Sequence, residues 1–160
     1  MSRGVKMEHK AIAEVLFANG YNCAQAVFVA YCDEMNMDKE TALKLSSSFG
    51  GGMGKLREVC GAVTGAFAVA GVLWGYTDVN DNKAKSDHYA LIRRIAEEFK
   101  AVHGTYICNY LLKGIANTDS KDPQPRTEEY YKVRPCVRFV STACEILDKI
   151  LAEKQAAVSV

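Results

Sequence analysis

An uncharged segment at residues 59–76 limits the folds that are open to this chain of 160 residues. As a helix rising about 1.5 Å per residue it would be about 27 Å long, which is the lower limit for crossing a membrane. No other segment resembles it, and its glycines come in pairs four residues apart, Gly61 with Gly65 and Gly71 with Gly75. Small residues on one helix face let neighbouring helices pack closely. We therefore predict that this segment is the central helix of a soluble bundle and not a membrane span.

The rest of the chain has the three- and four-residue spacing of apolar positions that is typical of helices, without the alternation expected of strands. Asn22 and Asp38 are suitable N-cap residues, while Gly20 and Gly104 are suited to end helices. The predicted fold is all-α, a bundle of about six to seven helices in one domain over residues 1–160, frayed at 1–6 and 155–160. We predict helices at residues 6–17, 22–32, 38–48, 56–74, 81–103, 106–113 and 135–154, a flexible loop at 50–54 and a polar loop at 117–126.

The composition excludes some classes of function. The formal net charge is +1, and 24% of the residues are charged. Binding to nucleic acid or to a membrane surface normally shows as a clustered basic excess, so we expect neither partner. The first ten residues contain no apolar stretch of the kind that directs secretion, so we expect a cytoplasmic protein whose thiols are kept reduced. The apolar helix faces would allow a homodimer.

The glycine-rich segment 50–54 does not meet the requirements of a phosphate-binding loop. Leu56 follows Gly54-Lys55 where a Walker A motif has Ser or Thr, and Phe49 occupies the position of the first glycine of that motif. The chain also contains no Cys-x-x-Cys pair. A thioredoxin-like motif and the common zinc-finger spacing are therefore both excluded.

Six cysteines are an unusual number for a cytoplasmic chain of this length. Four of them, Cys23, Cys60, Cys108 and Cys136, fall at or near the predicted starts of four different helices. A helix N-terminus carries unpaired N–H groups and a partial positive charge, which stabilise a thiolate, the nucleophilic and metal-binding form of cysteine. Because a bundle brings helix ends together, we predict that these four residues share a site. The alternative is that they are small buried hydrophobic residues.

Cys32 and Cys144 are expected to be core residues. Cys32 is nine residues beyond Cys23 on the same predicted helix, so it lies on the opposite face and about 13.5 Å further along the axis. It cannot join a site with Cys23 unless that helix breaks. Cys144 lies about 12 Å along the helix from Cys136, which is too far for a disulfide.

Several short motifs together resemble a known family. They are Asn22-Cys23-Ala24-Gln25, the glycine-rich segment 50–54, Cys60-Gly61-Ala62-Val63-Thr64-Gly65 and Arg134-Pro135-Cys136. With these motifs the chain resembles the C-GCAxxG-C-C family, described as redox-active proteins, over most of its length. The resemblance implies a redox role. It also implies that the four signature cysteines of the family correspond to Cys23, Cys60, Cys108 and Cys136.

Three functions are consistent with these residues. The first, which the sequence slightly favours, is a site of four thiolates that holds an iron–sulfur cluster or another thiophilic metal, because four thiolates need a compensating charge. The second is a metal-free thiol–disulfide oxidoreductase or redox relay with Cys60 as the nucleophile. The third is a non-catalytic helical interaction module whose cysteines belong to the core. In the first two, the partner is a redox protein or a small-molecule substrate.

Gly61 and Gly65 lie on one helix face just beyond Cys60. Their missing side chains leave room either for a neighbouring helix or for a cluster or substrate beside the sulfur. The second interpretation makes both glycines candidate cofactor-binding residues.

Overall fold

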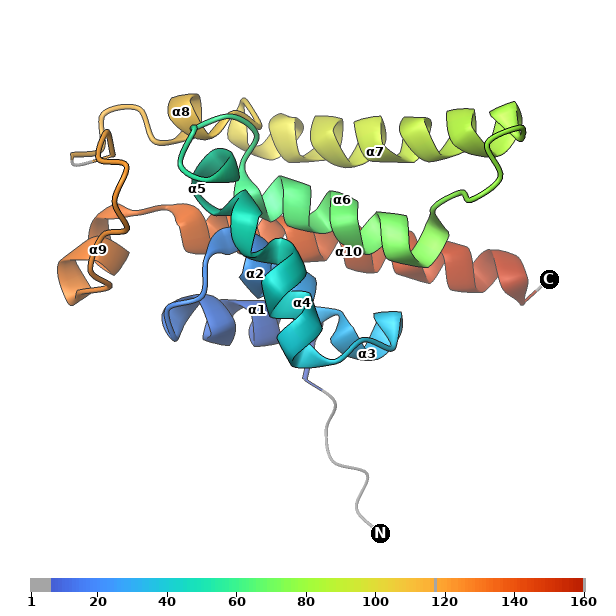
Figure 1. The fold of residues 1–160 in the computed structure, drawn as a ribbon, viewed down its shortest axis with the longest axis horizontal. Helices are drawn as coiled ribbons and strands as arrows, with labels where there is room; N and C mark the ends of the chain where they lie inside the picture. The colour runs from blue at the N-terminus through green and yellow to red at the C-terminus, as the bar shows by residue number, and fades with distance from the viewer. Residues whose placement is uncertain (1–6, 117, 160) are drawn as a thin grey trace, which may run out of the picture.

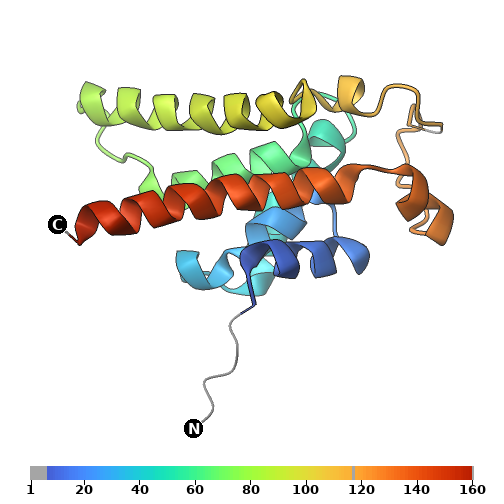
Figure 2. The same ribbon diagram turned by 180° about the vertical axis from the view of Figure 1, so that it is seen from behind.

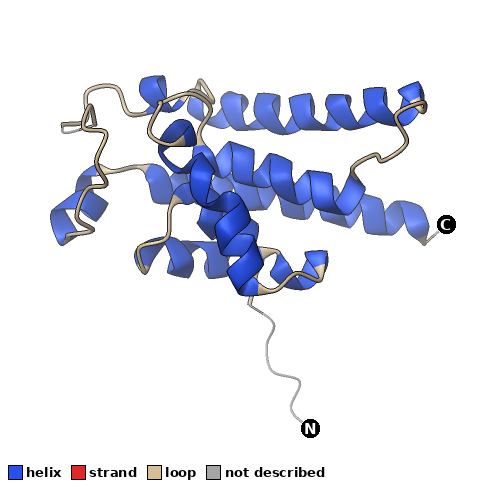
Figure 3. Ribbon diagram, in the orientation of Figure 1, coloured by secondary structure: helices blue, strands red, loops and turns tan. Residues whose placement is uncertain are grey.

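The structure, a computed structural model, describes residues 7–116 and 118–159. In this part of the chain, helices are the only regular secondary structure besides one isolated antiparallel bridge between Val59 and Ile107 (Figure 3). The all-α prediction is confirmed. In chain order the elements are α1 (His9–Ala18), α2 (Cys23–Ala30), α3 (Cys32–Met35), α4 (Lys39–Ser46), the 3-10 helix η1 (Ser47–Phe49), α5 (Gly50–Met53), α6 (Gly61–Trp74), α7 (Asn82–His103), α8 (Cys108–Leu111), α9 (Glu128–Val133) and α10 (Cys136–Val158).

The apolar segment forms the central helix, α6. It packs against α2, α7 and α10, while α1 packs against α2 and α10. In Figure 1, α6 and α10 run in the same direction, with α7 along one side and α1 to α4 on the other. In the reverse view of Figure 2, α10 lies nearest the viewer and partly covers α6. Among the described residues, no helix has both the length and the apolar character needed to cross a membrane.

The predicted helix at 22–32 is interrupted at Tyr31, which separates α2 from α3. Tyr31 leaves the helical conformation with φ −104° and ψ 14°. Its buried side chain reaches α10, where the hydroxyl donates to the carbonyl oxygen of Cys144 at 3.0 Å and to the carboxylate of Asp148 at 2.8 Å. The local sequence contains no helix breaker, so this break accompanies a tertiary contact that residue spacing cannot reveal.

Other helix boundaries also differ from the prediction. α6 begins at Gly61 and not near residue 56, and the short helices α5 and α9 were not expected. α10 extends to Val158, so residues 155–158 are helical where fraying was predicted. Residues 1–6, 117 and 160, which figured in the predicted frayed ends and the polar loop, lie outside the described residues.

Gly61 and Gly65 allow α6 to lie directly against the preceding elements. A Cβ atom at Gly65 would be 2.9 Å from the carbonyl oxygen of Ala24, and one at Gly61 would be 2.9 Å from that of Phe49. Real Cβ atoms do not approach backbone atoms so closely, so the contact requires glycine. The neighbouring helix fills the space that Gly65 leaves, and a role for either glycine beside a cofactor stays a prediction.

We expect Gly65→Ala to lower the free energy of unfolding by about 1–3 kcal/mol, because the added methyl group pushes α6 away from the α2 backbone. Gly71→Ala is the matched control, since a Cβ there meets nothing within 4 Å. That control should leave stability unchanged or raise it by up to about 1 kcal/mol. Urea unfolding followed by circular dichroism measures both variants. Equal unfolding free energies for the two would contradict the packing account.

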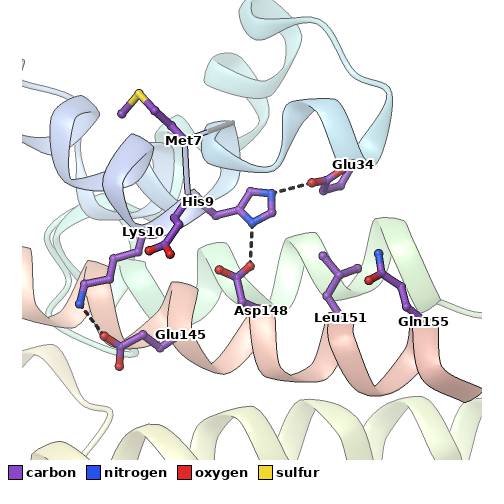
Figure 4. A pocket seen from close by; sticks show the side chains of 9 residues that line it. Met7, His9, Lys10, Glu34, Glu145, Asp148, Leu151 and Gln155 are labelled. Atoms are coloured by element: carbon purple, nitrogen blue, oxygen red, sulfur yellow. Dashed lines mark hydrogen bonds and ion pairs between the residues drawn. The ribbon is translucent and has the colours of Figure 1, made fainter. Parts of the chain in front are cut away.

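His9 links three helices on the face that is away from α7 (Figure 4). Its ring nitrogens lie 2.7 Å from the carboxylate of Asp148 on α10 and 2.7 Å from that of Glu34 on α3. The ring also stacks on Tyr31 at a centroid distance of 4.1 Å. The hydrogen bond to Asp148 is the main cause of a raised pKa for His9. We infer that the protonated imidazole holds α1 against α3 and α10.

The stabilising effect of His9 should depend on pH. Its folded pKa lies above the ordinary value of 6.5. Its ionic contribution is therefore fully present below about pH 6.5 and is lost as the pH rises through the folded pKa. We expect His9→Gln to lower the unfolding free energy by about 1–3 kcal/mol near pH 6 and by less near pH 9. Urea unfolding at both pH values measures this, and a loss of equal size at the two would argue against it.

Candidate functional site

Four helix starts meet at one end of the bundle, and each carries a cysteine. Cys23, Cys108 and Cys136 are the first residues of α2, α8 and α10, and Cys60 immediately precedes α6. The predicted placement at helix starts is confirmed for all four. Their side chains are free thiols and line one small cavity of about 50 Å³. In Figure 1 this region lies at the left, where α6 and α10 begin.

The segment before α6 and the segment before α8 are paired through their backbones. The N–H of Cys60 donates to the carbonyl oxygen of Tyr106 at 2.8 Å, and that of Cys108 donates to Glu58 at 2.6 Å. Both bonds flank the isolated bridge between Val59 and Ile107. These bonds hold Cys60 and Cys108, which are far apart in the sequence, on neighbouring backbone segments.

The glycine-rich segment forms one wall of the cavity. Residues 51–55 all have positive φ, between 60° and 68°. The element α5 is therefore not a regular right-handed helix but part of a left-handed turn, which stands in place of the predicted flexible loop. The turn is closed by N–H bonds from Arg57 to Gly51 and from Glu58 to Gly52. A Cβ on Gly52 would lie only 2.6 Å from the Cβ of Cys108. Glycine at this position therefore lets the turn approach the thiols.

Cys23 and Cys136 begin two different helices, and their side chains line the same cavity. The interaction between these two thiols is the main cause of a lowered pKa for Cys136 and of a strongly raised pKa for Cys23. Within this pair Cys136 is the more acidic thiol and Cys23 the less acidic one. The lower pKa falls to Cys136 because positive side chains face it.

Those positive side chains are three arginines that the sequence did not single out as site residues. Arg57, Arg126 and Arg134 line the thiol cavity, and each lowers the pKa of Cys136. The Arg57 guanidinium also donates to the sulfur of Cys108 at 3.5 Å. Arg134 is buried. Because it precedes Cys136 by only two residues, the sequence alone predicts that it lies near this thiol. Arg57 and Arg126 come from distant segments, and only the fold brings them here.

Cys60 and Cys108 are less acidic than Cys136. Burial raises the pKa of Cys60 to about 12, although the N–H groups at the start of α6 partly oppose this. Burial also raises the pKa of Cys108, against the effect of Arg57. A helix start alone therefore does not lower the pKa of a thiol here. Cys23 and the three arginines together make Cys136 the most acidic of the four thiols.

A comparison with protein-family models matches residues 21–150 to the family described as "Putative redox-active protein (C_GCAxxG_C_C)". The chain belongs to this family. No curated protein and no solved structure matches the chain. The matched range contains all four cysteines of the cavity, the left-handed turn and the three arginines.

Whether the thiols of this C-GCAxxG-C-C protein could bind a metal depends on how closely they are grouped. Over residues 7–116 and 118–159, no group of three or more His, Cys, Asp or Glu side chains is arranged so that it could hold a metal ion. The arginines also supply the positive charge for which a metal was invoked at the sequence level. As they lie here, the described thiols are not grouped as a set of three or more metal ligands.

The two remaining cysteines lie outside the cavity. Cys144 is fully buried on α10, and burial raises its pKa to about 12. Cys32 is partly buried and packs against the core at the start of α3. Although the helix does break between Cys23 and Cys32, the break does not bring Cys32 to the other thiols.

We expect Arg134→Gln to raise the pKa of Cys136, because a buried guanidinium beside the sulfur is lost. Near pH 7 the alkylation of Cys136 by the neutral reagent iodoacetamide should slow by about three- to tenfold. Its pH midpoint should move upward. Mass spectrometry of the Cys136 peptide measures the rate. The control variant is Arg138→Gln, because Arg138 is exposed on α10, the helix that begins with Cys136. The same slowing in both variants would argue against a specific effect of Arg134.

Proposed function

We propose that Cys23 and Cys136 form a redox-active dithiol that reduces disulfides without a metal. The observation that carries this proposal is that Cys23 and Cys136, at the starts of α2 and α10, line one cavity together with three arginines, where the pKa of Cys136 is lowered. A thiolate next to a protonated thiol is the arrangement that thiol–disulfide exchange requires. The nucleophile is thus Cys136 and not Cys60, the residue that the sequence suggested.

In the first step the Cys136 thiolate attacks one sulfur of a substrate disulfide. A mixed disulfide forms, the substrate S–S bond breaks, and one substrate sulfur leaves as a thiolate. In the second step Cys23 gives its proton to that leaving thiolate, and the Cys23 sulfur attacks Cys136. The second substrate thiolate then leaves. Two electrons pass to the substrate, and the protein is left with a Cys23–Cys136 disulfide.

The proposed place of action is the cytoplasm, where a redox partner or the thiol pool would return the disulfide to the dithiol. Reduction of disulfides would be a specific oxidoreductase reaction that agrees with the family description of a redox-active protein. Cys60 and Cys108 take no covalent part in this proposal, because Cys23 is the thiol that interacts most strongly with Cys136.

A redox titration tests the proposal. The protein is equilibrated with reduced and oxidised dithiothreitol at a series of ratios, and the remaining thiols are counted by mass after maleimide labelling. We expect two thiols to disappear together in one two-electron transition, and Cys32→Ser to show the same transition. Independent loss of single thiols, or no loss at any ratio, would refute the dithiol.

A second candidate function is a site that binds an iron–sulfur cluster or a thiophilic metal through Cys23, Cys60, Cys108 and Cys136. The observation in its favour is that the four sulfurs line one cavity. Anaerobic purification followed by metal analysis and a visible spectrum separates the candidates. The dithiol proposal expects less than about 0.1 metal per chain, whereas about one metal or cluster per chain would favour the second candidate.

A further inference from the structure

A wider cleft lies in front of the thiol cavity. Its volume is about 550 Å³, which is within the usual range for sites that bind small molecules. The two cavities share several lining residues, among them Arg57, Arg126 and Arg134. A molecule seated in the cleft would therefore lie next to the wall that holds the Cys23–Cys136 pair.

The cleft is lined by positive side chains. Besides the three arginines, Lys55 and Lys121 line it, and the lining residues described by the structure include no carboxylate. Like charges from Arg57 and Arg134 add to the effect of burial in lowering the pKa of Lys55. For a chain with a net charge of only +1, this is a strong local excess of one sign.

Acidic side chains compensate these five cations only weakly, through the attraction of Asp122 on Lys55. Within the described part of the chain, none of them forms an ion pair with Asp or Glu. Arg57 donates to the carbonyl oxygen of Thr118 at 2.8 and 3.1 Å, and Lys121 donates to that of Lys55 at 3.2 Å. The Nη1 atom of Arg126 is buried without a hydrogen-bond partner. A buried guanidinium nitrogen without an acceptor is costly unless a ligand supplies one.

We propose that this cleft binds the anionic groups of the substrate, and that the substrate is a small disulfide carrying carboxylates or phosphates. This inference rests on the proposed dithiol and adds the class of molecule on which it acts. Arginine forks recognise carboxylate and phosphate oxygens by paired hydrogen bonds. Anchoring these groups in the cleft would hold the disulfide sulfur against Cys136. A positively lined cleft also raises the local concentration of an anionic substrate.

The first experiment compares oxidation of the dithiol by three disulfides: the dianionic dithiobis(nitrobenzoate), the neutral dithiodipyridine and the cationic cystamine. Each rate constant is divided by the rate constant of the same disulfide with free cysteine, which removes its intrinsic reactivity. We expect the anion to be favoured over the neutral disulfide by about ten- to a hundredfold, and the cation to be disfavoured. Added salt should reduce this preference.

The test variant is Lys55→Gln/Lys121→Gln, which removes two charges from the cleft and leaves the arginines beside the thiols. The matched control is Lys83→Gln/Lys85→Gln, at the start of α7 and far from α5 and α9 (Figure 1). We expect the preference for the anion to fall by about threefold or more in the cleft variant only. An unchanged preference in the cleft variant, with the neutral disulfide still oxidising the protein, would overturn the substrate class and leave the dithiol intact.

A binding measurement separates the cleft from the redox reaction. Calorimetric titration with citrate, an anion that has no sulfur, should show saturable binding to the native chain and to the control variant. Binding should be weakened several-fold in the cleft variant. Absence of citrate binding would overturn the anion site. If no disulfide oxidises the pair although citrate binds, the proposed function fails, and with it the assignment of a disulfide substrate.

Discussion

Cys136→Ser should slow the reaction of the protein with neutral disulfides near pH 7 by about a hundredfold or more. The reason is that Cys136 is the thiol of the cavity whose pKa is lowered. The pKa of Cys23 is raised mainly by its interaction with Cys136, and burial raises the pKa of Cys60 and Cys108. A thiol with a raised pKa contributes little thiolate at neutral pH. Stopped-flow measurement with dithiodipyridine gives the rate.

Cys23→Ser should behave differently. This variant keeps the nucleophile but lacks the second thiol, so it should stop at a mixed disulfide that intact-mass spectrometry detects. Cys32→Ser is the control for removing a cysteine outside the cavity, and it should react as the native chain does. If Cys136→Ser reacts as fast as the native chain, or if Cys23→Ser forms no stable mixed disulfide, the assigned roles of the two residues are wrong.

Among alanine substitutions of the glycines in the left-handed turn, Gly52→Ala should lower the stability of the protein most. Its φ of 68° alone costs a non-glycine residue about 1–2 kcal/mol. The new Cβ would in addition lie 2.6 Å from Cys108 and 2.8 Å from the backbone of Glu58. We expect the unfolding free energy to fall by about 2–5 kcal/mol in total, with the thiol cavity disrupted.

Gly54→Ala separates backbone strain from the steric clash. Gly54 has a similar φ of 60°, but a Cβ there meets only the carbonyl oxygen of Ser48 at 3.9 Å. This variant should lose only about 1–2 kcal/mol and should keep the thiol chemistry. Urea unfolding and the dithiodipyridine rate, measured on both variants, test the difference. Equal losses of stability would show that the approach of the turn to Cys108 is unimportant.

The helices and the four cysteines were predictable because their signals are local. Asn22 and Asp38 accept N–H bonds at the starts of α2 and α4, and Gly104 ends α7 with a positive φ, as their residue types indicate. The placement of four cysteines at helix starts needs only such boundaries and the tendency of a bundle to gather helix ends.

The chemistry of the site was not predictable because it depends on contacts between distant segments. Arg57 and Arg126 reach the thiols from an unusual turn and from a long loop, and neither position has a local signal. The same holds for the break at Tyr31, which accompanies a hydrogen bond to α10. Without the arginines, four thiols suggested a metal to balance their charge. With them, Cys136 is the thiol whose pKa is lowered, and this favours the proposed dithiol.

The most direct test of the account is a peptide map of the disulfide that forms when the native chain is oxidised with one equivalent of dithiodipyridine. Free thiols are blocked with iodoacetamide before digestion, and the linked peptides are identified by mass spectrometry. We expect a single intramolecular disulfide between Cys23 and Cys136, with Cys32 and Cys144 recovered as alkylated, unlinked peptides. A disulfide that joins any other pair, or a chain without an intramolecular disulfide, would contradict the account.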